Sequence, residues 1–242
     1  TNSLGAMWRD NHPIVLHPHR PEPSKGLWQT VEVVDRLVHR HKIKDLRVLV
    51  PRWFDADLSS EVRDYYNRIN EEIRQRGIEA NFHFHTWIPQ RLMHEYFSVG
   101  DVMLALGHFI EAFGNTVYES LGCGTPSIAA RVGPYRDQLP DELHDKVDFN
   151  DHDAAAEIAA HIIQRGRRTS AETLAYLHEH YNVADQLEAY AETILSAAKQ
   201  PPVTYRHTPL NATTRFNLAP WCYQSAPGVF FHDFKATHAP IP

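Results

Sequence analysis

A phosphate-binding segment is predicted where a loop runs into a helix in the middle of the chain. The segment reads Glu111-Ala-Phe-Gly-Asn-Thr-Val-Tyr-Glu119-Ser-Leu-Gly-Cys-Gly-Thr-Pro126. Gly114 permits a close approach of the backbone to a ligand. The N–H groups of Asn115, Thr116 and Val117 would be free at the helix N-terminus, which is a position that favours an anionic phosphate.

Two glutamates flank this helix start and add hydrogen-bond acceptors to it. Glu119 lies about one turn into the predicted helix, with its side chain leaning back toward the N-terminus. A carboxylate there can accept two hydroxyl hydrogen bonds, as from a ribose diol. Glu111 is still in the loop and can reach further out over a ligand. Taken singly, Glu119 could merely complement the helix dipole and Glu111 could be a solvated loop acid; their combination favours a binding site.

A second cluster supplies positive charge between the first predicted strand and the first long helix. It reads His17-Pro-His-Arg20-Pro-Glu-Pro-Ser-Lys25-Gly26. Arg20 and Lys25 should stand at the carboxyl edge of the sheet, where open parallel sheets bind ligands. A forked guanidinium and a compact ammonium together suit a diphosphate whose charge rises as it leaves. The alternative is a solvated loop in which Ser24 is the helix N-cap.

The histidines of this cluster have two interpretations. His17 and His19 could contact a ligand, although a satisfied core or loop histidine is the commoner case.

The elements that must position these residues alternate between short apolar runs and longer helical patterns, which is typical of an α/β fold with a doubly wound, Rossmann-like parallel sheet. The predicted strands are Pro13–His17, Leu46–Val50, Ala80–Phe84, Asp101–Leu106 and Pro126–Ala130. The predicted helices are Lys25–His41, Leu58–Arg76, Pro89–Val99 and Asn115–Gly122, then Asp151–Arg165, Ser170–His180 and Val183–Lys199. Asp151 and Ser170 are expected N-caps, and Pro89 suits a first turn.

The organisation changes near the C-terminus. We expect one Rossmann-like domain with trailing helices over residues 1–199 and an irregular tail, rich in Pro and aromatic residues, over residues 200–242. Because large aromatic side chains favour burial, we expect this tail to wrap around its own domain or a partner.

Composition excludes several classes of protein. The chain has 242 residues, 43% of them hydrophobic, which is ample for a packed core. The net charge of −6 argues against a broad nucleic-acid surface. No apolar run is long enough for a membrane span, and the first ten residues do not resemble a secretory leader. Two cysteines are too few for a disulfide framework, so we expect a reducing, cytoplasmic compartment.

The two clusters, in this order, resemble the donor-binding C-terminal domain of a GT-B glycosyltransferase. The motifs are similar to those of the retaining enzymes of glycosyltransferase family 4, also called group 1. They are Arg20, Lys25-Gly26, the Glu111-Ala-Phe-Gly run with Glu119, Gly122-Cys-Gly-Thr-Pro126 and Val132-Gly133. The resemblance extends from about Ile14 to Asp137.

The resemblance implies a role for each residue. Arg20 and Lys25 would hold the donor diphosphate and stabilise the leaving group, with help from the amides around Asn115 and Thr116. Glu119 would bind the ribose, and Glu111 would face hydroxyls of the transferred sugar near the reaction centre.

The loop after the third predicted strand would take part in recognising the base, according to the same resemblance. It contains Trp87 and Ile88, which could act by stacking or through backbone hydrogen bonds. Core packing is an equally good interpretation of Trp87.

The resemblance also implies what accompanies the chain. The donor is a nucleoside-diphosphate sugar that carries a hexose, and the acceptor offers a hydroxyl. The resemblance implies a metal-independent enzyme that neutralises its leaving group with Arg and Lys, so no metal or other cofactor is expected. Because the resemblance covers only the second of two similar domains, we expect activity to need an N-terminal acceptor domain or a partner subunit. The base, the sugar and the acceptor stay open, as does peripheral membrane association.

Other functions remain as alternatives. A noncatalytic nucleotide-binding or assembly module could keep this fold and dock a partner through its C-terminal tail. A nucleotide-sugar epimerase of GT-B type fits the glutamate pair less well. A dinucleotide-binding dehydrogenase fits least, since no G-x-G-x-x-G follows the first predicted strand.

Overall fold

The computed structural model describes residues 12–20, 22–52, 60–108, 111, 113–198, 209, 211–215, 222–226, 229–232 and 237–240. The first ten residues, considered above for a leader, lie outside this part of the chain. At its centre is a six-stranded sheet in the order β3-β2-β1-β4-β5-β6, in which all neighbouring strands are parallel. The strands are β1 Ile14–Leu16, β2 Arg47–Pro51, β3 Phe82–His85, β4 Val102–Ala105, β5 Ser127–Ala130 and β6 Asp145–Val147.

The five predicted strands are confirmed, and β6 is an addition. Two of the three residues of β6 are charged, so the apolar pattern that marks the other strands is absent from it. The Lys146 side chain is nevertheless buried. Its ammonium donates hydrogen bonds to the carbonyl oxygens of Arg136 and Leu139, which compensate for the loss of hydration. A buried charge of this kind is accommodated by polar partners and leaves no apolar signal in the sequence.

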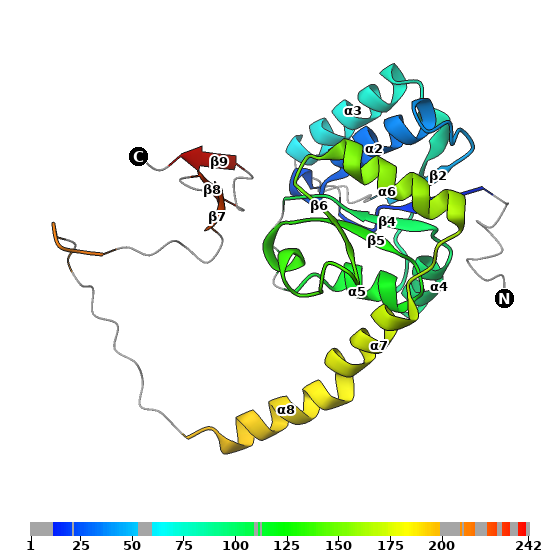
Figure 1. Cartoon of the computed structure of the whole chain (residues 1–242). Helices are drawn as coiled ribbons and strands as arrows, with labels where there is room; N and C mark the ends of the chain where they lie inside the picture. Colours follow the sequence, from blue (N-terminus) through cyan, green and yellow to red (C-terminus); the bar gives the residue numbers. More distant parts are fainter. Residues whose placement is uncertain are drawn as a thin grey trace.

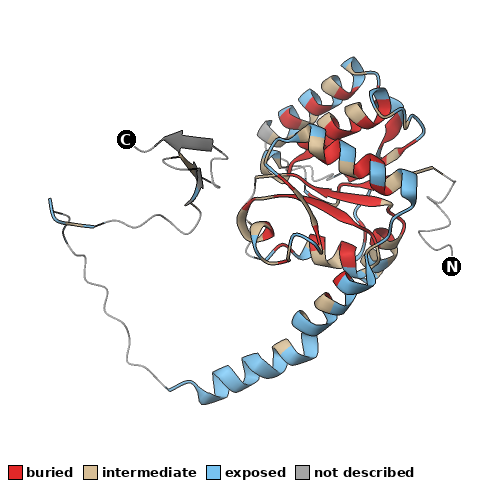
Figure 2. Ribbon diagram, viewed as in Figure 1, coloured by how far each residue is buried: buried red, intermediate tan, exposed pale blue. Residues whose placement is uncertain are grey.

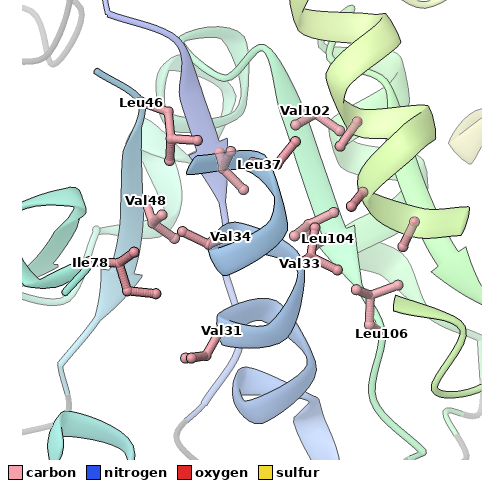
Figure 3. Close-up of a cluster of buried hydrophobic side chains, with 14 of the residues drawn as sticks. Val31, Val33, Val34, Leu37, Leu46, Val48, Ile78, Val102, Leu104 and Leu106 are labelled. Atoms are coloured by element: carbon pink, nitrogen blue, oxygen red, sulfur yellow. The ribbon is translucent and has the colours of Figure 1, made fainter. Parts of the chain in front are cut away.

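Alternation along the strands creates two cores, one on each face of the sheet. On β1 and β4, Val15, Val102 and Leu104 face one core, whereas Leu16 and Met103 face the other. Figure 3 shows the first core, in which side chains of the helix after β1 pack against Val102 and Leu104. These strands are buried on both faces, which explains why they read as continuous apolar runs.

Helices cover both faces and give a three-layer α/β/α architecture (Figure 1). One face carries α2 Leu27–His39, α3 Ser60–Gln75 and α6 His152–Arg165, and the other carries α4 Met93–Ser98, α5 Asn115–Gly122 and α7 Ala171–His180. Short 3₁₀ turns complete the domain: η1 Pro23–Lys25, η2 Glu79–Asn81, η3 Gln90–Leu92 and η4 Gly133–Arg136. The predicted Rossmann-like α/β fold is confirmed.

The predicted helix starts are partly corrected. Asp151 and Ser170 are N-caps, and each side chain accepts a backbone N–H. Ser24 is not a cap, because it lies inside the 3₁₀ turn η1 and α2 begins after Gly26. Pro89 precedes the 3₁₀ turn η3 instead of occupying a first α-helical turn.

Helix α8, Val183–Ser196, extends from the domain with almost every residue exposed (Figure 2). Its apolar side chains at positions 183, 187, 190 and 194 follow the helical period and are 62–74% exposed. None of the helices in the described ranges is both long and apolar enough to cross a bilayer.

The tail is not wholly irregular. It contains an antiparallel sheet of three strands, β7 Cys222–Ala226, β8 Val229–His232 and β9 Thr237–Pro240. The Val-Phe-Phe run of β8 has high strand propensity, and Pro227-Gly228 in the sequence is a turn signal between the first two strands. Most of the remaining tail lies outside the described residues, so its expected wrapping around the domain stays a prediction.

Gly26 gives the fold a test with a matched control. It adopts φ +86° at the start of α2, and a Cβ there would lie 2.4 Å from the backbone nitrogen of Gly107. Gly77 also has a positive φ, +68°, but a Cβ there would meet nothing within 4 Å. Gly77→Ala should therefore lower the free energy of unfolding by about 1 kcal/mol, the left-handed strain alone. Gly26→Ala should lower it by roughly 1–3 kcal/mol more, because the backbones must separate.

Urea denaturation of the two variants measures the difference. Equal losses would show that the contact between Gly26 and Gly107 is loose.

Candidate functional site

The two clusters meet where the strand order reverses. Strand β1 lies beside β4 in the sheet, and the chain leaves β1 toward β2 on one side and β4 toward β5 on the other. Open α/β sheets form their ligand crevice at the carboxyl end of such a switch point. Here the crevice contains a small hollow that is open to solvent. The residues that line it are His19, Ser24, Lys25, Ala105, Gly107, Glu111 and Tyr135.

Two glycines allow the loops after β1 and β4 to touch through their backbones. A Cβ on Gly107 would lie 2.2 Å from the carbonyl oxygen of Ser24, and one on Gly26 would meet Gly107 in turn. No larger side chain could stand between the loops at this point. The contact therefore fixes the residue before Gly26, Lys25, close to the residues that follow β4.

Lys25 and Glu111 form an ion pair in the hollow. The Lys25 Nζ donates to Glu111 Oε1 at 2.5 Å, across 86 positions of sequence. The two side chains are 15% and 26% exposed, so solvent screens their attraction only in part. The expected meeting of the basic cluster with the acidic one is confirmed for this pair.

Helix α5 begins beside the pair and offers backbone donors. Gly114 is its N-cap, with φ +86° and no side-chain cap. Within the described ranges the amides of Asn115 and Thr116 have no backbone acceptor, whereas the Val117 amide donates to the carbonyl oxygen of Gly114. The prediction of free N–H groups thus holds for two residues and is wrong for Val117, because the first turn is tightened.

Glu119 lies one turn along α5 and does not take part in the Lys25–Glu111 pair. Its carboxyl is half-buried, and burial raises its pKa. A partly desolvated carboxylate gains from hydroxyl donors, which is the environment that a diol would complete.

Arg20 reaches the same sheet edge, but its side chain is turned to solvent. Its nearest acidic partner is Glu22, with Nη1 and Oε1 3.8 Å apart, and the side chain is 66% exposed. An exposed pair at this distance restrains the arginine weakly. The structure therefore places Arg20 within the loop, yet not inside the hollow with Lys25.

The loop after β3 separates its two candidate residues. Trp87 is 59% exposed, so the core interpretation of this side chain is wrong. Ile88 is 8% exposed and packs in the second core beside residues such as Leu49 and Tyr96. The Ile88 side chain is thus structural, and only its backbone could face a base.

Tyr135 is a site residue that the sequence analysis did not identify. It comes from η4, after β5, and its ring lies against Gly114, where a Cβ would be 2.3 Å from the Tyr135 Cε1. The Tyr135 hydroxyl is hydrogen-bonded to the Thr116 side chain. Burial raises the pKa of Tyr135 to about 12, and the nearby Glu111 adds to the effect. Its position after a strand at the carboxyl edge was the available signal.

The two histidines after β1 are both buried. His17 is fully buried and its Nδ1 is hydrogen-bonded to the Thr30 hydroxyl, 2.9 Å away. His19 is 8% exposed, bonds to the Leu104 carbonyl oxygen and lines the hollow. The interpretation as a core histidine therefore describes His17, whereas His19 belongs to the core and to the site.

The described residues contain no group of three or more His, Cys, Asp or Glu side chains arranged to hold a metal ion. Among the described residues that line the hollow, Lys25 is the one lysine or arginine.

Known structures share this fold. Anabaena HepE, solved in complex with UDP, is 18% identical, with a TM-score of 0.66 over 77% of this chain and 50% of that one. Sucrose-phosphate synthase from Thermosynechococcus elongatus is 21% identical, with a TM-score of 0.55 over 77% and 47%. The C-terminal domain of the group 1 family protein LpcC from Francisella tularensis is 14% identical, with a TM-score of 0.58 over 71% and 87%.

The chain spans about half the length of HepE. No curated protein sequence matches it. The family described as glycosyl transferases group 1 matches residues 6–177, which include both loops of the hollow and helix α5. The chain belongs to the group 1 glycosyltransferases.

Proposed function

We propose that this chain is the donor-binding domain of a retaining glycosyltransferase of family 4, which transfers a hexose from a nucleoside-diphosphate sugar to an acceptor hydroxyl. The observation that carries the proposal is the Lys25–Glu111 pair in a hollow at the switch point of the sheet. Family membership and HepE, solved with UDP and with UDP-glucose, support a uridine nucleotide as the first donor to test.

The diphosphate would bind where the donors converge. The amides of Asn115 and Thr116 lie at the positive end of α5, and the Lys25 ammonium is held by Glu111, four residues before that helix start. As the bond between sugar and phosphate breaks, negative charge grows on the leaving diphosphate. A fixed ammonium and fixed amides stabilise that charge without having to reorganise. Arg20, on the exposed part of the loop, would add a mobile guanidinium.

Glu111 has two partners in this scheme. Without a ligand it neutralises Lys25, and with a phosphate bound it would give up the ammonium to the stronger anion. The carboxylate is then available to accept hydrogen bonds from hydroxyls of the transferred sugar. Glu119 would accept those of the ribose, and Trp87 would lie beside the base.

A second domain or a partner subunit would complete the enzyme and supply the acceptor site. The exposed apolar face of α8 is a surface on which such a partner could pack. The same face favours the alternative of a noncatalytic module that docks a partner, and UDP-sugar turnover by the assembled protein would separate the two.

Lys25→Ala should weaken UDP binding by about ten- to a hundredfold, because a charged hydrogen bond is lost and Glu111 is left unpaired near the phosphate. Isothermal titration calorimetry measures the change. Lys44→Ala, at an exposed lysine on the same chain, is the control and should leave the Kd unchanged. UDP binding that is equally strong in both variants would remove Lys25 from the site.

Glu111→Gln should tighten UDP binding by several-fold, because Lys25 no longer has to exchange one anion for another and a like charge is removed from the phosphate. The same variant should lose sugar transfer in the assembled enzyme. Glu79→Gln removes an exposed acid from η2, which precedes β3 at the amino edge of the sheet, and serves as the control that should leave the Kd of UDP unchanged. Weaker binding of UDP to Glu111→Gln would contradict the exchange of partners.

A further inference from the structure

His19 presents an unused acceptor to the hollow. Its Nε2 lies 3.2 Å from the carbonyl oxygen of Leu104. A carbonyl oxygen can only accept, so Nε2 carries the hydrogen of this bond. Burial, and then the nearby Lys25 charge, lower the pKa of His19 to about 4, so the ring is neutral near pH 7. The other nitrogen, Nδ1, therefore bears a lone pair.

This lone pair has no partner within the described part of the chain. The Nδ1 of His19 has no hydrogen bond there. Unlike the buried polar atoms that lack a partner, it is not sealed from solvent. Because the residue is 8% exposed and lines the hollow beside Lys25 and Glu111, the hollow is where Nδ1 can be reached.

The neighbouring His17 shows that burial alone does not produce this arrangement. The two rings pack edge to face, with centroids 5.0 Å apart. The Nδ1 of His17 is occupied by Thr30, and its Nε2 is sealed from solvent without a partner in the described ranges. Of the two rings, only that of His19 lines the hollow.

A neutral acceptor selects among the parts of a nucleotide sugar. A diphosphate near pH 7 offers lone pairs and negative charge, which suit Lys25 and the amides of α5 but not a second lone pair. A sugar offers hydroxyl donors. In a partly desolvated site, a hydroxyl left without a partner costs more binding free energy than the hydrogen bond itself contributes. A contact to a sugar hydroxyl therefore discriminates between ligands.

We propose that Nδ1 of His19 accepts a hydrogen bond from a hydroxyl of the transferred sugar, so that the site favours a nucleoside-diphosphate sugar over the nucleoside diphosphate alone. The inference rests on the proposed function, because it assumes that the hollow holds the donor. His19 becomes a residue that determines specificity, next to the sugar-facing Glu111.

Calorimetry with UDP and with UDP-glucose, UDP-galactose and UDP-mannose tests the proposal, with the UDP-hexose that binds wild type most tightly used for comparison. His19→Leu should weaken binding of that UDP-hexose by roughly five- to fiftyfold and leave the Kd of UDP within about twofold. His19→Asn should keep most of the selectivity, because its side-chain oxygen can occupy the position of Nδ1. His17→Leu is the matched control and should not change the ratio of the two Kd values.

The outcomes separate the two proposals. If wild type binds UDP and the UDP-hexose, and His19→Leu weakens both equally or neither, the role of His19 is overturned while the donor site stands. If wild type binds none of the four nucleotides, the uridine donor site is overturned, and the role of His19 within it is overturned with it. Should His19→Leu fold poorly by circular dichroism, His19→Phe keeps a planar ring without the acceptor and must show the same loss of selectivity.

Discussion

The contact between the backbones of Gly26 and Gly107 is the constraint from which the site follows. Strands β1 and β4 are neighbours in the sheet, but they are far apart in sequence, and their loops leave in different directions. Only where both loops lack a side chain can they approach as closely as they do here. The approach places Lys25 over the start of the segment that carries Glu111, so a packing feature with no chemistry of its own creates the charged hollow.

The Lys25–Glu111 pair contributes little to the stability of the fold, and its main effect is to hold the Lys25 ammonium in position for a ligand. Two partly buried ions lose hydration, and their attraction does little more than offset that loss. The pair holds an ammonium in place on Glu111, in the loop that leads into α5, without leaving an unpaired cation in a low-dielectric crevice. A diphosphate entering the crevice would find its counter-charge already oriented and would exchange one anion for another. The more exposed Arg20 has no such restraint and can follow the ligand.

The sequence predicted the layers of the fold well, because apolar alternation and helical period are local properties. It missed β6, whose charged residues hide the strand, and the strands of the tail, where the Val-Phe-Phe run of β8 stands in a region without a repeating pattern. That Lys25 and Glu111 share one edge of the sheet could be predicted, because both follow strands at their carboxyl ends, but the glycine contact that brings their side chains together could not. The places of Trp87 and Tyr135 could not: an aromatic residue in a loop can face the core, the solvent or a ligand, and the choice depends on distances between elements that no local pattern encodes.

One cation links the two kinds of recognition in the hollow. Lys25 attracts an anion directly, and the same positive charge helps to keep the buried ring of His19 neutral. An imidazolium at this point would add a second cation and remove the lone pair on Nδ1. The site would then bind phosphate more strongly and would have no acceptor for a hydroxyl. Because burial and Lys25 act in the same direction on the pKa of His19, the hollow contains a cationic donor and a neutral acceptor side by side. A ligand that carries both a phosphate and a sugar hydroxyl satisfies both groups, whereas inorganic phosphate satisfies only one.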